Sequence, residues 1–139
     1  MNEIYNLNSS EQPEDNIGAL TTSDYEFLFS NMITGFAFHE VITDENQNPI
    51  DYRFLAVNPE FEKLTGLKAE NIIGRCVKEI LPGIEDIWIK EFGNVALTGI
   101  PKQFENYVAE LNKYYEVRAY SPGFRKFAVL FFDVTERIN

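Results

Sequence analysis

The sequence is poor in the residues that build metal centres and nucleophilic sites: it has one cysteine, Cys76, and one histidine, His39, in 139 residues. A single cysteine excludes a disulfide or a cysteine metal cluster within the chain, and it favours a reducing, cytoplasmic location. Long apolar runs are also lacking, because the longest, Phe127 to Phe132, is far too short to span a bilayer. We therefore expect no membrane insertion in this segment.

Basic residues are scarce as well, with 12 Lys and Arg against 22 Asp and Glu and a formal net charge of -10. This balance argues against a nucleic-acid binder or an anionic-membrane binder, since both need basic surface. The remaining composition, 45% hydrophobic and 14% aromatic, is that of a folded globular protein. The length is sufficient for one domain with a real core.

Motifs that carry catalysis are missing. There is no glycine-rich phosphate loop, no Gly-x-Ser-x-Gly elbow and no His/Cys cluster at metal-ligand spacing. We expect no metal site and no catalytic residues, with a small enzyme using acidic residues as the remaining alternative. His39 is interpreted as a half-buried strand histidine and Cys76 as a small buried hydrophobe.

The first 21 residues are polar and without period, which predicts a flexible tail or linker over 1–21. An ordered domain follows over 22–135, and 136–139 are expected to start a C-terminal helix. Ser23 and Glu26 fit a capping box at the start of the first helix. Its apolar stripe is Tyr25, Leu28, Phe29 and Met32.

Hydrophobic periodicity predicts five strands and several short helices. Asn58-Pro59 starts a helix that Gly66 stops, and Asn112-Lys113 and Ser121–Gly123 are predicted turns. Strands are expected over 35–42, 50–57, 103–111, 114–120 and 126–133, with short helical turns over 69–81 and a longer helix over 86–97. Runs of strands rather than strict alternation indicate an α+β fold with an antiparallel sheet.

The last predicted strand is apolar on both faces from Phe127 to Phe132. A strand with one solvated face would alternate, so both faces of the sheet should be covered there. The helices between 59 and 97 can cover one face. Either the N-terminal helix or a second subunit must cover the other, and the two can coexist.

Three stretches carry a resemblance to the PAS domain family: Tyr52–Gly66, Ile72–Arg75 with Glu79–Pro82, and the terminal Asp133–Arg137, which looks like the family's Asp-x-Thr-Glu-Arg exit motif. The resemblance implies a five-stranded antiparallel sheet with short helices on one face and an N-terminal helix flanking it. It also implies a sensory or dimerisation module of a larger signalling protein, such as a histidine kinase of a two-component phosphorelay or a diguanylate cyclase.

In PAS-like proteins the last strand continues into a helix that carries the output, and the signal-relay residues here are Asp133, Thr135, Glu136 and Arg137. Asp133 can cap this helix, with Glu136 completing a box and Thr135 as an alternative cap. Arg137 lies four residues after Asp133, within reach of an ion pair. We expect that pair to act as a latch fixing the direction of exit.

PAS-like domains can hold a small ligand between sheet and helices. Polar contacts to it could come from Asn58, Tyr115 or Arg118, and the alternative is a solid core without a cavity. The predicted lining is apolar and aromatic: Phe36, Phe38, Asn58, Ile73, Val77, Ile80, Trp88, Phe92, Val95, Phe104, Val117, Val129 and Phe131.

The sequence argues against haem and flavin and leaves the cofactor unknown. Haem-binding relatives typically place the ligand on the long helix, here 86–97, which has no histidine. The flavin-binding light sensors carry Gly-x-Asn-Cys-Arg-Phe-Leu-Gln. The corresponding stretch from Gly74 to Leu81 has its cysteine one position early and lacks the asparagine.

These observations predict a cytoplasmic, homodimeric sensor module with a C-terminal effector domain, binding a small molecule or relaying a conformational signal. The alternative is a ligand-free dimerisation scaffold within a multidomain kinase or cyclase.

Overall fold

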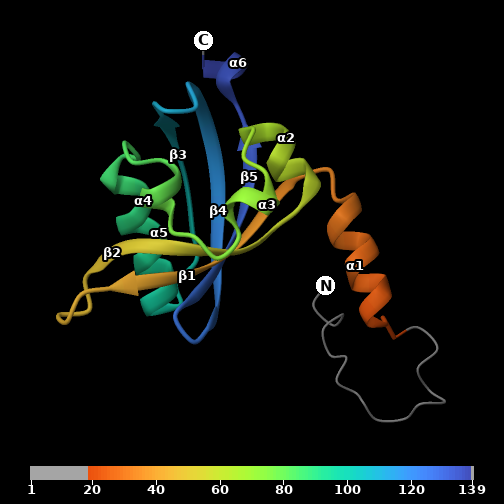
Figure 1. Cartoon of the computed structure of the whole chain (residues 1–139), viewed down its shortest axis with the longest axis horizontal. Helices are drawn as coiled ribbons and strands as arrows, with labels where there is room; N and C mark the ends of the chain where they lie inside the picture. Colours follow the sequence, from red (N-terminus) through yellow and green to blue (C-terminus); the bar gives the residue numbers. More distant parts are fainter. Residues whose placement is uncertain (1–18, 139) are drawn as a thin grey trace. The chain divides into compact units, whose positions relative to one another are not determined.

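The computed structural model describes residues 19–138, apart from the side chain of Ile138. The chain divides into two compact units between Asn31 and Met32. The first contributes helix α1, and the second holds the sheet and the other helices (Figure 1). Residues 1–18 of the predicted tail lie outside the described residues, so the predicted limits of tail and domain stay a prediction.

Helix α1, Thr22–Asn31, begins at a capping box two residues earlier than predicted. The Thr21 hydroxyl accepts from the Asp24 N–H at 3.0 Å, and the Asp24 carboxylate accepts from the Thr21 N–H at 2.9 Å. The predicted box of Ser23 and Glu26 is wrong, because Thr21 and Asp24 offer a hydroxyl and an acid at the same spacing just upstream.

The second unit is built on one five-stranded antiparallel sheet, as predicted (Figure 1). Its order is β2-β1-β5-β4-β3, so the last strand lies in the middle of the sheet. The strands are β1 (Gly35–Thr43), β2 (Pro49–Val57), β3 (Lys102–Val108), β4 (Lys113–Gly123) and β5 (Lys126–Asp133).

Four helices cover one face of this sheet, which we call the inner face: α2 (Pro59–Thr65), α3 (Ala69–Ile72), α4 (Val77–Ile80) and α5 (Asp86–Thr98). Helix α2 has Asn58 as its N-cap and ends at Gly66, whose φ is 79°. Both signals were predicted and are confirmed. Helix α5 buries Trp88, Phe92 and Val95 against the sheet.

Strand β5 pairs with β1 on one side and with β4 on the other. Phe127, Val129 and Phe131 are buried on the inner face, where Phe127 stacks on Phe92 of α5. The alternating Leu130 and its neighbours on the outer face are partly buried. Apolar residues at both parities therefore reflect a central strand in which neither face is fully solvated.

Two predicted turns differ from the structure. Ser121–Gly123 belongs to β4, and the chain reverses at Phe124 and Arg125, whose φ values are 58° and 65°. The tight turn at Asn112-Lys113 is also wrong, because β3 already ends at Val108 and a longer loop follows. That loop is fixed by hydrogen bonds to the α4–α5 segment that no local turn signal predicts.

Gly93 of α5 lies close to the start of β2. A Cβ at this position would fall far inside normal contact distance of Cβ and Cγ of Pro49. We expect Gly93→Ala to lower the free energy of unfolding in urea by about 1 kcal/mol, and by at most about 2 kcal/mol. The overpacking penalty of about 1–3 kcal/mol should exceed the gain of about 1 kcal/mol in helix propensity.

Asn94→Ala, at the exposed neighbouring position on the same helix, is the matched control, with an expected change within about 0.5 kcal/mol. A Gly93→Ala variant as stable as the native chain, or more stable, would contradict this packing.

Candidate functional site

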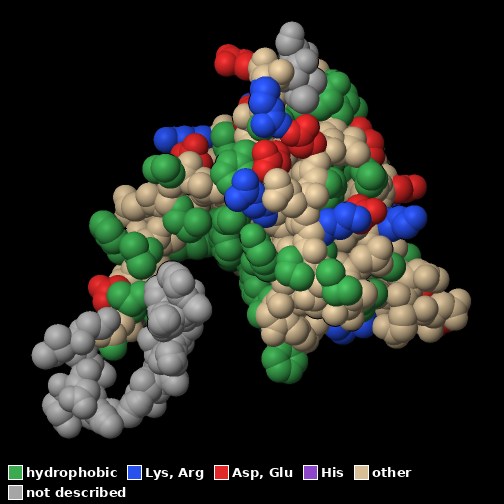
Figure 2. Space-filling model, turned by 180° about the vertical axis from the view of Figure 1, so that it is seen from behind, with side chains coloured by type: hydrophobic (Ala, Val, Ile, Leu, Met, Phe, Trp, Pro, Cys, Tyr) green, Lys and Arg blue, Asp and Glu red, His purple; other side chains and the backbone are tan. Residues whose placement is uncertain are grey.

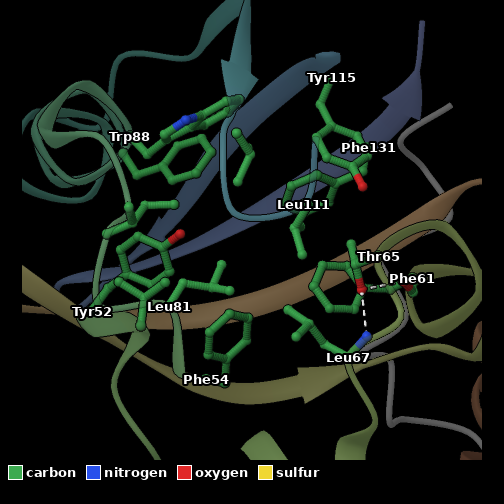
Figure 3. A pocket seen from close by; sticks show the side chains of 14 residues that line it. Tyr52, Phe54, Phe61, Thr65, Leu67, Leu81, Trp88, Leu111, Tyr115 and Phe131 are labelled. Atoms are coloured by element: carbon green, nitrogen blue, oxygen red, sulfur yellow. Dashed lines mark hydrogen bonds between the residues drawn. The ribbon is translucent and has the colours of Figure 1, made fainter. Parts of the chain in front are cut away.

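A small cavity lies between the inner face of the sheet and the helices (Figure 3). Its volume is about 30 Å³. Its walls come from β2, β3, β4 and β5, from α2, α4 and α5, and from the loops that follow α2, α4 and β3. The lining residues are Tyr52, Phe54, Phe61, Thr65, Leu67, Val77, Leu81, Ile84, Trp88, Phe92, Val108, Leu111, Tyr115 and Phe131.

This cavity is small and almost wholly apolar. It can hold about one or two water-sized molecules, whereas sites for drug-sized ligands or cofactors occupy about 300–1,000 Å³. Its polar side chains are largely engaged: the Thr65 hydroxyl donates to the Phe61 carbonyl, and Nε1 of Trp88 donates to the Tyr107 carbonyl. In this conformation the region is close to the solid core that the sequence left open as the alternative.

The structure brings four of the predicted lining residues to the cavity: Val77, Trp88, Phe92 and Phe131. The others lie elsewhere in or around the core. Val95, Val117 and Val129 are buried, and Ile80 and Phe104 are partly buried against the core.

Phe36, Phe38 and Ile73 do not face the cavity. Ala37, His39 and Val41 are buried on β1, so the alternating Phe36 and Phe38 lie on the outer face. Ile73 follows α3 and is 42% exposed. The prediction that these two phenylalanines line the pocket is therefore corrected, because their positions in β1 place them on the other face of the sheet.

Several lining residues were not predicted. Tyr52 and Phe54 share one face of β2, so their alternation could have indicated them. Leu67 and Leu111 lie in loops, where no period marks a residue as buried. Their contribution depends on how the loops fold back over the sheet.

Asn58 is a structural residue rather than a polar contact for a ligand. Its Oδ1 accepts from the Phe36 N–H at 2.9 Å and from the Phe61 N–H at 3.0 Å, and its Nδ2 donates to the Thr34 carbonyl at 3.0 Å. The side chain is fully buried. It therefore ties the start of β1 to the start of α2.

The residues around Cys76 do not fit a flavin adduct. Cys76 precedes α4 and is partly exposed, whereas the next residue, Val77, is buried and lines the cavity. The one-residue offset seen in the sequence thus turns the thiol away from the cavity. Burial and then the nearby Asp51 carboxylate raise the pKa of the thiol, which disfavours the reactive thiolate.

His39 is fully buried on β1, not half-buried as predicted. Its ring stacks on Phe127 at 4.6 Å between centroids and meets the edges of Tyr52 and Phe54 at 4.8 Å. Neither ring nitrogen has a hydrogen-bond partner within residues 19–138. Burial lowers the pKa of His39 to about 3, so the imidazole is neutral in the folded domain.

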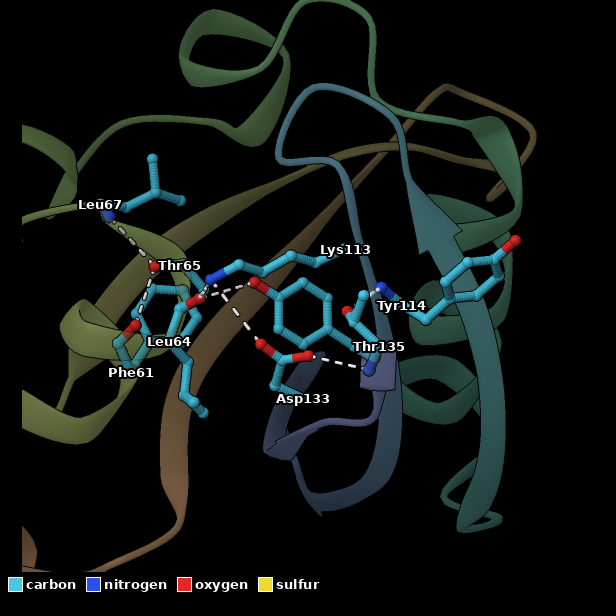
Figure 4. A network of polar contacts seen from close by, with 9 residues as sticks. Phe61, Leu64, Thr65, Leu67, Lys113, Tyr114, Asp133 and Thr135 are labelled. Atoms are coloured by element: carbon cyan, nitrogen blue, oxygen red, sulfur yellow. Dashed lines mark hydrogen bonds and ion pairs between the residues drawn. The ribbon is translucent and has the colours of Figure 1, made fainter. Parts of the chain in front are cut away.

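The second part of the site is the segment that leaves the sheet, residues 133–138, which we call the exit segment (Figure 4). Helix α6, Thr135–Ile138, starts two residues after β5 ends. The Asp133 carboxylate accepts from the Thr135 N–H at 3.0 Å, and the Thr135 hydroxyl accepts from the Tyr114 N–H at 3.0 Å. The exit segment is thus hydrogen-bonded to the beginning of β4.

The predicted ion pair between Asp133 and Arg137 is not formed. Asp133 instead faces Lys113, with 3.6 Å between Oδ2 and Nζ. Partial burial alone would raise the pKa of Asp133, but the bonds to Thr135 and Lys113 outweigh it and lower the pKa. Arg137 pairs with Glu105 and Glu116, and Glu136 is exposed.

Lys113 connects the exit segment to α2. Its ammonium donates to the Leu64 carbonyl at 3.1 Å, and the Tyr115 hydroxyl donates to the same carbonyl at 2.8 Å (Figure 4). Tyr115 and the adjacent Thr65 both line the cavity. A chain of contacts therefore joins the cavity wall, the end of α2 and Asp133.

Of three comparisons with known proteins, the one with solved structures finds this geometry. A scan with family models finds no match, and neither does a search of curated proteins. Among solved structures, the chain is similar to an RNA-binding Light-Oxygen-Voltage receptor at 17% identity and a TM-score of 0.62, over 94% of this chain but 36% of that receptor.

A domain of a sensory box sensor histidine kinase/response regulator from Geobacter sulfurreducens is similar at 16% identity and a TM-score of 0.58, over 81% of this chain and 93% of that one. The LOV domain of a blue-light activated histidine kinase from Erythrobacter litoralis is similar at 15% identity and 0.50, over 73% and 96%. LOV and sensory-box domains are PAS domains, and the chain has their fold, as the sequence resemblance indicated.

The buried His39 makes a prediction about stability and pH. Its pKa in the folded domain, about 3, lies below the ordinary value of 6.5, so the unfolded chain binds a proton that the folded chain does not between these values. Stability should therefore fall as the pH drops from 7 to 5, by about 2 kcal/mol from this residue alone.

His39→Phe should remove that part of the pH dependence in urea unfolding at pH 7 and 5. Tyr52→Phe alters a neighbouring aromatic residue and leaves His39 in place. This variant should retain the pH dependence of stability. An equal slope in the native chain and in His39→Phe would show that His39 is accessible to protons in the folded state.

Proposed function

We propose that this chain is a sensory module that passes a conformational change from its cavity region to the segment after β5. The observation that carries the proposal is the shared Leu64 carbonyl, which accepts from cavity-lining Tyr115 and from Lys113, the partner of Asp133. A shift of α2 would change both bonds together, and Lys113 would pass the change to the exit segment.

The similar structures support the signalling context. Two of the three come from histidine kinases, so a histidine kinase or a related multidomain protein is the parent we propose, acting in the cytoplasm through a C-terminal effector. The RNA binding of the third is not carried over, because this chain spans 36% of that receptor and has a net charge of -10. No described helix is long and apolar enough to cross a membrane.

The size and lining of the cavity set the class of ligand. With about 30 Å³ and no charged side chain in its wall, the cavity suits a small, uncharged, apolar molecule rather than a flavin or haem. Larger ligands would require the β3–β4 loop, which contributes Leu111, to move.

Xenon is a suitable probe, because it enters small apolar cavities. In amide NMR of the native chain under xenon pressure, we expect shifts at Leu67 and Leu111 beside the cavity and also at Thr135 and Arg137 in the exit segment. In Lys113→Met the cavity shifts should persist and the exit shifts should become smaller, since the bond to Leu64 and the ion pair to Asp133 are both lost and only the path through β5 remains.

Lys68→Met is the matched control, because Lys68 is exposed and has no ion pair within the described residues. It should behave like the native chain. Exit shifts of native size in Lys113→Met would contradict the relay through Lys113, and absence of any cavity shift would contradict the ligand class.

A second candidate function is a ligand-free homodimerisation module. The small cavity favours it, as do the partly buried apolar residues Phe36, Phe38, Leu130 and Phe132 on the outer face of the sheet. Sedimentation of the native chain with Leu130→Glu as the comparison should show a dimer that the substitution dissociates. If the native chain and Leu130→Glu are both monomers, and the native chain binds xenon, sensing remains the proposed function.

A further inference from the structure

The outer face of the sheet carries a charged cluster beside the exit helix, formed by Glu105, Glu116, Arg118 and Arg137, which we call the outer latch. Figure 2 shows acidic and basic side chains side by side at the end of the molecule where α6 lies. Glu105 and Glu116 stand directly opposite each other in the β3–β4 ladder. Two like charges in that position destabilise a sheet unless a cation lies between them.

Arg137 supplies that cation from α6. One of its Nη atoms pairs with Glu105, and the other lies 3.9 Å from Oε1 of Glu116. Arg137 thereby holds the exit helix against the outer face, although Glu105 lies 32 positions away from it in the chain. This contact replaces the Asp133–Arg137 latch expected from spacing.

Glu116 has two further partners, both on Oε2. Nε2 of Gln103 donates to this oxygen at 3.0 Å. Nη2 of Arg118 lies 3.3 Å from the same oxygen, and the Arg118 guanidinium lies 5.1 Å from the ring centroid of Phe132. Its Nε is buried and has no hydrogen-bond partner in the part of the chain described. A carboxylate can accept hydrogen bonds from Nε and Nη2 of one arginine at the same time. Arg118 uses only Nη2, so this paired arrangement is not formed.

We propose that the outer latch is a two-state switch in which Arg137 and Arg118 compete for Glu116. In the state seen here, Glu116 is shared, α6 is docked and Nε of Arg118 is unsatisfied. In the other state, Glu116 accepts from Nε and Nη2 of Arg118, and Arg137 keeps Glu105 alone or leaves with α6.

In the second state, the buried Nε of Arg118 donates a hydrogen bond to Glu116. This bond offsets part of the free-energy cost of releasing α6. This gain reduces the free-energy difference between the two states, and a signalling element requires that difference to be small. This inference rests on the proposed function, because a docked and a released exit helix matter only if that helix carries a signal.

The test uses NMR of the native chain and measures docking without any ligand or effector. The readouts are solvent exchange of the Arg137 amide, which donates to the Val134 carbonyl, and the Nε–Hε resonance of Arg118. Arg118→Met removes the competitor and should slow Arg137 amide exchange about 1.4- to 5-fold, the range expected for one exposed ion pair. Arg137→Met should move the Arg118 Nε–Hε resonance toward a carboxylate-bonded position.

Glu105→Gln should speed exchange of the Arg137 amide, because it weakens docking while Arg118 is untouched. Lys126→Met, which removes one positive charge from β5 away from the latch, is the control and should change neither readout. Faster or unchanged Arg137 exchange in Arg118→Met, or an unmoved Arg118 resonance in Arg137→Met, would overturn the competition. The xenon experiment with Lys113→Met tests the relay separately, so the two proposals can fail independently.

Discussion

Strand β5 is hydrogen-bonded on both sides, to β1 and to β4, and runs into the exit helix almost without interruption. The junction is itself fixed to the sheet. The Val134 N–H donates to the Tyr114 carbonyl at 3.0 Å, and the Thr135 hydroxyl accepts from the Tyr114 N–H. Any displacement of the central strand must therefore be transmitted to α6, because no flexible turn lies between them.

The exit segment is held from both faces of the sheet. On the inner face, Asp133 faces Lys113, whose second contact is the end of α2. On the outer face, Arg137 lies between Glu105 and Glu116. Partly exposed ion pairs of this kind contribute only about 0.2–1 kcal/mol each. They add little to the stability of the domain, but they are well matched to biasing a helix between docked and released positions.

The cavity and the buried histidine show where the core departs from simple packing. Within the described residues, His39 has no hydrogen-bond partner for either ring nitrogen among the stacked aromatic rings, at a cost that a phenylalanine would avoid. The cavity lies beside these rings, since Tyr52, Phe54 and Phe92 contact His39 and also line it. The aromatic core is therefore the region that a bound molecule would rearrange first.

The sequence predicted the elements better than their contacts. Strand and helix positions followed from period and from signals such as Asn58-Pro59 and Gly66, which act locally. The pocket was predicted in part only, because apolar residues at both parities of β1 leave open which parity faces the helices. The partner of Arg137 could not be found by spacing, since Glu105 reaches it only through the pairing of β3, β4 and β5.

Strand β5 and helix α6 should move as one rigid unit, and backbone ¹⁵N relaxation of residues 127–137 can measure this. Order parameters should stay near those of rigid backbone, about 0.85, through Phe132, Asp133 and Val134 and into Thr135. A fall below about 0.6 at Asp133 or Val134, with β5 still rigid, would show a hinge at the junction and would rule out rigid continuity.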